Sequence, residues 1–284
     1  MAPVFPQMAH LAQPIGEAWM TGNDSVFSNG PYARRRLGEA WPEMPVEWRG
    51  TSIRRSGVFP ILTKFIFAEE KLSVQVHPDD EYASKHEAAA GGVGKTEMWY
   101  ALRARPGAEV LAGLKPEVTR DKFQQAIADG TAEDCLEHVP IKEGEAIFIP
   151  ARTAHTIGPG LVLCEIQQHS DLTYRVFDYN RRDSNGRTRE LHIDKALAVM
   201  RFGAQNCGKL QPARFEHAGA RESFFIACPY FATEQWDFES AISRSTSRDR
   251  FELLIILKGS GRISWSEGEA EYGPAQAWLL PAAL

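Results

Sequence analysis

The sequence predicts a mainly β protein with helical insertions. Apolar runs of strand length recur along the chain, and turns rich in glycine, proline and asparagine separate them. Examples are residues 58–67, 146–150 and 161–168. Helical spacing is restricted to short stretches, so we expect helices between the strands and not as the framework of the fold.

Helices are expected in the middle of the chain. Pro116 opens a stretch between residues 115 and 139 that fits two short helices separated by Gly130. Its apolar residues recur at roughly helical spacing: Val118, Phe123, Ile127 and Leu136. A further helix is predicted near residues 193–202, where the apolar stripe is typical of core packing and not of a cofactor site.

The last part of the chain returns to strands from about residue 224. Residues 250–257 and 262–265 are strand-like, and a glycine-rich turn at 258–261 lies between them. A phosphate-binding loop leads into a helix N-terminus, whereas this turn leads into another strand. We therefore predict a hairpin.

Composition excludes several classes of protein. The chain has 284 residues, is 43% hydrophobic and has a net charge of -5, which is enough for one large or two medium domains. No long basic run exists, and the cluster at 34–36 is too short to indicate nucleic acid binding. No apolar run reaches the roughly 18 residues of a membrane span, and residues 1–20 lack a signal-peptide pattern. We expect a cytoplasmic protein.

The four cysteines are widely spaced and form no C-x-x-C pair, which disfavours a zinc knuckle and a disulfide framework. They are Cys135, Cys164, Cys207 and Cys228. We expect reduced thiols without a catalytic role.

A polar strand face is the first indication of a site. In a strand over residues 72–77, Ser73, Gln75 and His77 share one side because successive side chains alternate. Burying a glutamine and a histidine together is costly unless both have partners, and a metal suits an amide oxygen beside an imidazole.

A second strand extends this prediction. Lys95, Glu97 and Trp99 share one face, and His155 follows an apolar run at 146–149. We therefore predict a metal bound by Gln75, His77, Glu97 and His155. Glu165 and Gln167 also share a strand face, on which they could line the barrel near His155 or hydrogen-bond to the metal-bound imidazoles. Of these two roles we expect the hydrogen bonds to the imidazoles.

Gly144, Pro150 and His155 are spaced as in the second half-motif of the cupin barrel, which they resemble. Residues 273–281 repeat the strand-to-proline part without a histidine. The resemblance implies two cupin (jelly-roll) barrels. The metal-bearing barrel is expected over residues 1–200, with a helical insertion at about 115–139, and a degenerate barrel over 201–284.

Gln-x-His-Pro at 75–78, Lys-x-Glu-Met at 95–98 and the later Pro150 and His155 resemble the zinc-ligand arrangement of type I phosphomannose isomerases, particularly the short bacterial branch. Further matching segments follow in the family's order, and together they span most of the chain: 15–19, 72–82, 94–102, 144–157 and 165–180.

The sequence also departs from the family pattern. That pattern leads us to expect a segment upstream of residues 16–19 and one or two strands after 281–284. Gly94 stands where the long-chain relatives have a histidine, so no role of that histidine carries over.

The resemblance implies a zinc-dependent isomerase, with one zinc per chain, that interconverts mannose 6-phosphate and fructose 6-phosphate through an enediol intermediate. It implies catalytic roles for Lys95, for Arg175 as a substrate clamp, and for Asp171 in proton transfer; the group that abstracts the proton stays open. Without the resemblance, we would expect Asp171 and Arg175 to form an ion pair on the surface that contributes little to stability. We expect a sugar phosphate as the small-molecule partner, no nucleic acid or membrane partner, and a monomer or small homo-oligomer.

Two alternatives stay open. A cupin oxygenase would use two histidines and one carboxylate for iron, and the additional Gln75 argues against it. A sugar-phosphate-binding regulator without turnover is the other alternative. Such a protein is expected to lose Lys95 or Arg175, and both are present.

Overall fold

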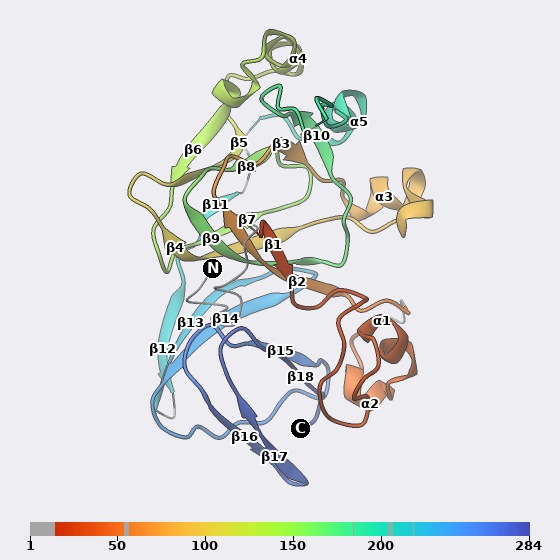
Figure 1. The fold of residues 1–284 in the computed structure, drawn as a ribbon, viewed down its shortest axis with the longest axis vertical. Coiled ribbons are helices and arrows are strands. Elements are labelled where there is room, and N and C mark those ends of the chain that lie inside the picture. Colours follow the sequence, from red (N-terminus) through yellow and green to blue (C-terminus); the bar gives the residue numbers. More distant parts are fainter. Residues whose placement is uncertain (1–14, 54–56, 184, 204, 206, 218) are drawn as a thin grey trace. The chain divides into compact units, whose positions relative to one another are not determined.

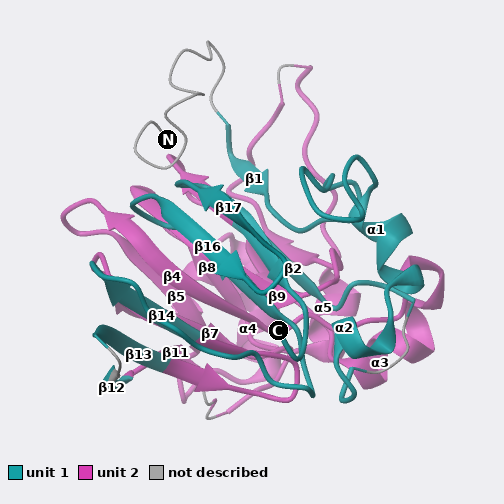
Figure 2. Cartoon of the chain, turned by 90° about the horizontal axis from the view of Figure 1, so that it is seen from below, with its two compact units in different colours: residues 1–64, 213–224, 234–284 teal, residues 65–212, 225–233 magenta. Residues whose placement is uncertain are grey.

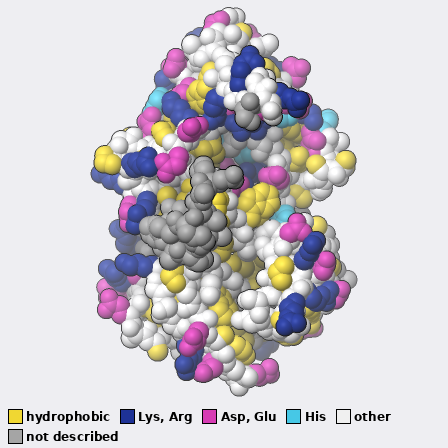
Figure 3. Space-filling model, viewed as in Figure 1, with side chains coloured by type: hydrophobic (Ala, Val, Ile, Leu, Met, Phe, Trp, Pro, Cys, Tyr) yellow, Lys and Arg dark blue, Asp and Glu magenta, His cyan; other side chains and the backbone are white. Residues whose placement is uncertain are grey.

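The computed structural model describes residues 15–53, 57–183, 185–203, 205, 207–217 and 219–284 (Figure 1). The described chain is mainly β, as predicted. None of its helices is both long and apolar enough to cross a membrane. On the face seen in Figure 3, basic and acidic side chains are interspersed.

The chain divides into two compact units (Figure 2). Unit 1 contains residues 1–64, 213–224 and 234–284, and unit 2 contains residues 65–212 and 225–233. The division therefore does not follow a boundary at residue 200, because residues 1–64 group with the C-terminal strands.

Unit 2 is built on two sheets with antiparallel pairing between their neighbouring strands. Within unit 2, one sheet has the strand order β2 (Ile61–Ala68), β9 (Leu161–Gln168), β4 (Glu97–Ala104), β7 (Ala146–Ile149) and β11 (Gly208–Lys209), and β2 begins in unit 1. The other has the order β10 (Tyr174–Phe177), β3 (Val74–Val76), β8 (His155–Ile157), β5 (Glu109–Leu114) and β6 (Leu136–Pro140).

The two sheets face each other across one apolar cluster. Alternate residues of strands from both sheets are buried in it: Trp99, Ala101, Val110, Ala112, Ile147, Ile149, Ile157, Leu161 and Leu163. The period of two therefore divides each strand into an inner and an outer face.

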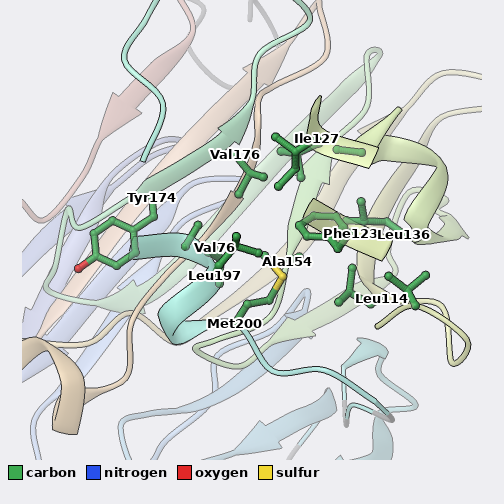
Figure 4. Packing of buried hydrophobic residues seen from close by; sticks show 14 of the residues in the cluster. Val76, Leu114, Phe123, Ile127, Leu136, Ala154, Tyr174, Val176, Leu197 and Met200 are labelled. Atoms are coloured by element: carbon green, nitrogen blue, oxygen red, sulfur yellow. The ribbon is translucent and has the colours of Figure 1, made fainter. Parts of the chain in front are cut away.

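Helices cover the outer face of the second sheet (Figure 4). These are α4 (Arg120–Asp129), the short 3-10 helix η4 (Ala132–Cys135) and α5 (Ile193–Val199). Thr119 caps α4 by accepting a hydrogen bond from the Lys122 amide, and Gly130 ends it with a φ of 74°. The predicted helices are confirmed, except that Leu136 begins strand β6.

The loop between β3 and β4 carries α3 (Asp80–His86) and the short helix η3 (Ala88–Ala90). The outer face of the first sheet is covered within unit 2 by Phe225, Ile226 and Phe231, which pack against Met98 and Ala146.

Unit 1 contains short helices and small sheets. The helices are α1 (Leu37–Ala40), η2 (Trp41–Glu43) and α2 (Val46–Arg49). The strands are β1 (Glu17–Trp19), β12 (Ala213–His217), β13 (Ala220–Ala227), β14 (Ala232–Phe238), β15 (Glu252–Ile255), β16 (Gly261–Trp265), β17 (Gly268–Tyr272) and β18 (Ala277–Leu280), of which β13 ends in unit 2 and β14 begins there.

Aromatic side chains form the core of unit 1. The Trp41 ring lies 4.9 Å from that of Phe59 and 5.2 Å from that of Phe251, measured between centroids. Gly50 supports this packing, because a Cβ there would lie 2.4 Å from the backbone oxygen of Asp249, and its φ is 96°.

The predicted hairpin around residues 258–261 is wrong. β15 pairs with β18, and β16 pairs with β17. A tight connection at 266–267 joins β16 to its partner β17. The glycine-rich segment at 258–261 therefore joins β15 and β16, which belong to different sheets.

Candidate metal centre and active site

Strand ends of both sheets of unit 2 carry the predicted ligands. Gln75 lies in β3, and His77 follows that strand directly. Glu97 is the first residue of β4 and His155 the first of β8. Because Gln75 and His155 are directly opposite in the β3–β8 pairing, their side chains share one face.

These side chains converge. The Glu97 Oε1 atom lies 3.2 Å from His155 Nε2 and 3.6 Å from His77 Nε2. One ligand atom from each of these three residues fits within a span of 4.8 Å. The Gln75 amide nitrogen lies 3.2 Å from His155 Nε2, and rotating the amide by half a turn places its oxygen there instead.

Backbone carbonyls orient both imidazoles. Nδ1 of His77 lies 2.7 Å from the carbonyl oxygen of Leu172, and Nδ1 of His155 lies 2.9 Å from that of Thr153. With Nδ1 donating, each Nε2 carries a lone pair. The predicted role of Glu165 and Gln167 is therefore wrong, since Glu165 accepts from Trp99 Nε1 and Gln167 donates to two backbone carbonyls.

Lys95 supplies positive charge beside this set. Its Nζ lies 3.2 Å from Glu97 Oε2, and both side chains are buried. Burial would lower the pKa of Lys95, but Glu97 and Glu165 outweigh this and raise it. Burial would likewise raise the pKa of Glu97, yet Lys95 and the imidazoles hold it well below its usual value.

The imidazoles are neutral. Burial, together with the charge of Lys95, lowers the pKa of His77 to about 3. Burial also lowers the pKa of His155. Protonation of the two imidazoles therefore does not relieve the repulsion between their Nε2 lone pairs and the Glu97 carboxylate.

The donor set fits a cation. His77 Nε2 and Glu97 Oε1 are buried, and within the described chain neither has a hydrogen-bond partner. Such lone pairs facing one another are unfavourable unless a positive ion lies between them. Two imidazole nitrogens with carboxylate and amide oxygens suit zinc.

The three predicted catalytic residues differ in how close they lie to the predicted metal ligands. Arg175 is opposite Gln75 in the β10–β3 pairing, and its Nη1 donates to the Glu190 carbonyl at 2.9 Å. Asp171 is exposed, and its charge contributes to raising the pKa of Lys95. Lys95 thus contacts the predicted ligand Glu97 directly, and Arg175 shares a strand face with the predicted ligand Gln75. Asp171 lies at the surface.

A hydrogen-bonded chain that the sequence did not predict supports Glu97. The Thr96 amide donates to Gln168 Oε1 at 2.8 Å, and Gln168 Nε2 donates to Asp80 Oδ1 at 3.0 Å. Thr96 Oγ1 in turn accepts from the Ala151 amide. Asp80 follows Asp79, the N-cap of α3, and this helix start could have been found from the sequence, since Asp-Asp after a proline is a helix start signal. No local sequence pattern predicts the hydrogen-bond partners of Gln168, which lie far away in the chain.

A cavity of about 360 Å³ lies elsewhere in unit 2. The turns at 105–109 and 158–160 line it, together with Lys71, Leu111 and Thr156. It contains none of the predicted ligands, so it is not the predicted site.

Residues 3–134 match the family model of the phosphomannose isomerase type I catalytic domain. The Streptococcus mutans mannose-6-phosphate isomerase is 36% identical over 257 residues, which cover 89% of this chain and 78% of that protein. The chain belongs to the type I phosphomannose isomerase family. The Bacillus subtilis protein named probable mannose-6-phosphate isomerase GmuF is 35% identical and covers 95% of this chain, with 85% of its own length matched.

Solved structures of this phosphomannose isomerase family have the same fold. The crystal structure of mannose 6-phosphate isomerase from Bacillus subtilis matches with a TM-score of 0.86 and 30% identity over 98% of this chain and 88% of that one. A zinc-bound mannose 6-phosphate isomerase matches with a TM-score of 0.70 over 98% of this chain and 90% of that one. At 18% identity the second match shows the fold alone.

Proposed function

We propose that the chain is a zinc-dependent aldose–ketose isomerase that interconverts mannose 6-phosphate and fructose 6-phosphate. Membership of the phosphomannose isomerase family supports the reaction. The observation that carries the proposal is the convergence of two neutral imidazoles and a carboxylate beside a buried lysine.

In this proposal Gln75, His77, Glu97 and His155 hold one zinc ion. When bound, zinc supplies a Lewis acid for the oxygens of the substrate. The barrel that carries this centre is a metal-bearing cupin barrel within residues 1–200, and strands within 201–284 form a second, degenerate barrel.

The remaining roles belong to charged side chains. The proton moves between carbons 1 and 2 of the open-chain sugar through an enediol. Lys95 stabilises the negative charge that develops on the sugar oxygens, since its ammonium is already fixed in a buried site. Arg175 clamps the substrate, and Asp171 takes part in proton transfer.

A coupled assay that compares mannose 6-phosphate with free mannose tests the reaction. We expect a far higher kcat/KM for the phosphate ester, because binding energy from the phosphate positions the reacting carbons. Equal rates with the two sugars would contradict the proposed substrate.

Metal analysis tests the ligand assignment independently. We expect about one zinc per chain, which a chelator removes together with activity. His77→Ala and His155→Ala proteins that keep full zinc content would show that the assignment is wrong.

A further inference from the structure

Gln167 is a buried side chain of the centre without an assigned task. It lies in β9 directly opposite Glu97 of β4, and its exposed fraction is 0%. Residues directly opposite in an antiparallel pair share a face, and their Cβ atoms lie about 4.5–5.5 Å apart. Gln167 therefore lies on the inner face beside the carboxylate that belongs to the candidate metal set.

The orientation of its amide is determined by two backbone groups. Gln167 Nε2 donates to the carbonyl of Gln168 at 3.0 Å and to that of Ser170 at 2.6 Å. Because both N–H groups are used, a flipped amide would place an oxygen against two carbonyls. The oxygen Oε1 is therefore directed away from them.

This oxygen lacks a donor. Oε1 is buried, and no donor of the described residues reaches it. A buried acceptor without a hydrogen bond is unfavourable, and in native proteins such groups are rare, so this one calls for a donor from outside the chain. The nearby groups of the centre do not supply a donor. The Glu97 carboxylate and the Nε2 lone pairs of the imidazoles are acceptors themselves, and the Lys95 ammonium is paired with Glu97 at 3.2 Å.

We propose that Gln167 is a substrate-binding residue whose Oε1 accepts a hydrogen bond from a hydroxyl group of the sugar. This inference rests on the proposed function. An open-chain sugar phosphate brings several O–H donors, any one of which can satisfy this acceptor. A neutral amide provides the acceptor without placing a second negative charge beside Glu97, which a glutamate at this position would do.

Binding of mannitol 6-phosphate, a polyol that cannot isomerise, tests the proposal by calorimetry on the zinc-loaded protein. Gln167→Met has a similar length but an apolar end that accepts no comparable hydrogen bond. We expect its Kd for mannitol 6-phosphate to rise about tenfold or more, while zinc content and zinc affinity in chelator competition stay unchanged. Gln125→Met, an exposed site on α4, is the matched control and should keep the wild-type Kd.

Gln167→Asn provides a second variant if the methionine protein does not fold. It keeps the amide but withdraws it by one methylene, and the same loss of polyol affinity is expected. An unchanged Kd in either folded variant overturns the inference, and so does a loss of affinity that merely follows a loss of zinc. A wild-type protein that neither isomerises mannose 6-phosphate nor binds the polyol contradicts the proposed function instead.

Discussion

Lys95 is a buried cation whose charge depends on its acidic neighbours. Removing a lysine from water favours its neutral form, but the Glu97 carboxylate at 3.2 Å reverses that preference. The ammonium therefore stays charged and fixed before a substrate arrives. Preorganised charge of this kind is what an isomerase needs for a developing oxyanion.

Substituting Lys95 should separate catalysis from metal binding. Lys95→Met and Arg175→Met are each expected to lower kcat about a hundredfold or more while zinc content is retained, because each removes one preorganised donor. Steady-state kinetics and metal analysis on the same preparations provide the measurement. Lys85→Met, an exposed lysine on α3 paired with Glu81, should leave both unchanged. Near-normal turnover of the first two variants would refute their placement in the site.

Asp178 stabilises the segment that follows Arg175. Its carboxylate hydrogen-bonds to Arg181 and Arg189. Burial would raise the pKa of Asp178, but the two arginines outweigh it and lower this pKa below its usual value. A carboxyl group with a lowered pKa in the folded state stabilises the protein above its unfolded pKa, and this stabilisation is lost as pH falls.

We expect Asp178→Asn to lower the free energy of unfolding at pH 7 by about 1–3 kcal/mol. The difference from wild type should begin to shrink as pH falls below about 4, where the unfolded carboxyl takes up a proton, and it should be lost as pH falls through the lowered pKa of the folded carboxyl. Urea denaturation at pH 7 and at about pH 3.5 measures it. Asp121→Asn, at the start of α4, should change stability by about half a kcal/mol or less at both values. A pH-independent difference for Asp178→Asn would contradict the charge argument.

Alternation along the strands could be predicted from the sequence, because polar and apolar residues alternate around Gln75. Gln75 and Glu97 were thus placed on inner faces, and the structure brings them to the same centre. Strand partners were not readable, since pairing depends on residues far away in the chain. β15 therefore pairs with β18 and not with its sequence neighbour β16.

The turn before β4 positions Lys95 and Glu97 through a close backbone contact. A Cβ at Gly94 would lie 2.6 Å from the backbone of Asp79 and Asp80, and the Gly94 amide donates to Asp80 Oδ1. Because the obstacle is backbone, it cannot move aside like a flexible side chain. The whole segment would have to shift.

Gly94→Ala should therefore weaken zinc binding and lower kcat by about tenfold or more, since small displacements of a positioned group are costly. The fold should survive with stability reduced by about 1–3 kcal/mol. Chelator competition and the coupled assay measure these effects. Gly273→Ala is the matched control, because a Cβ there meets nothing within 4 Å. Wild-type zinc affinity in Gly94→Ala would show that the turn tolerates the methyl group.

The proposed metal ties together the two sheets of unit 2. Glu97 comes from the first sheet, whereas Gln75 and His155 come from the second. A cation held by both sheets binds the folded chain and not the unfolded chain, so it adds to stability by mass action. Zinc binding at the proposed ligands should thus raise the free energy of unfolding of the protein.

Chelation should lower the melting temperature measurably. With free zinc a thousandfold above Kd, zinc binding adds about 4 kcal/mol to the free energy of unfolding. Each kcal/mol corresponds to a change of about 2–4 °C in the melting temperature for a domain of this size. Removing zinc should therefore lower the midpoint by about 8 °C or more in a thermal scan of the wild-type protein. His155→Ala should start at the lower midpoint and respond little to chelator. His138→Ala removes a partly exposed histidine on β6 that pairs with Glu109, so it should retain the wild-type response. An equal response of His155→Ala and wild type would mean that the stabilising ion lies at another site.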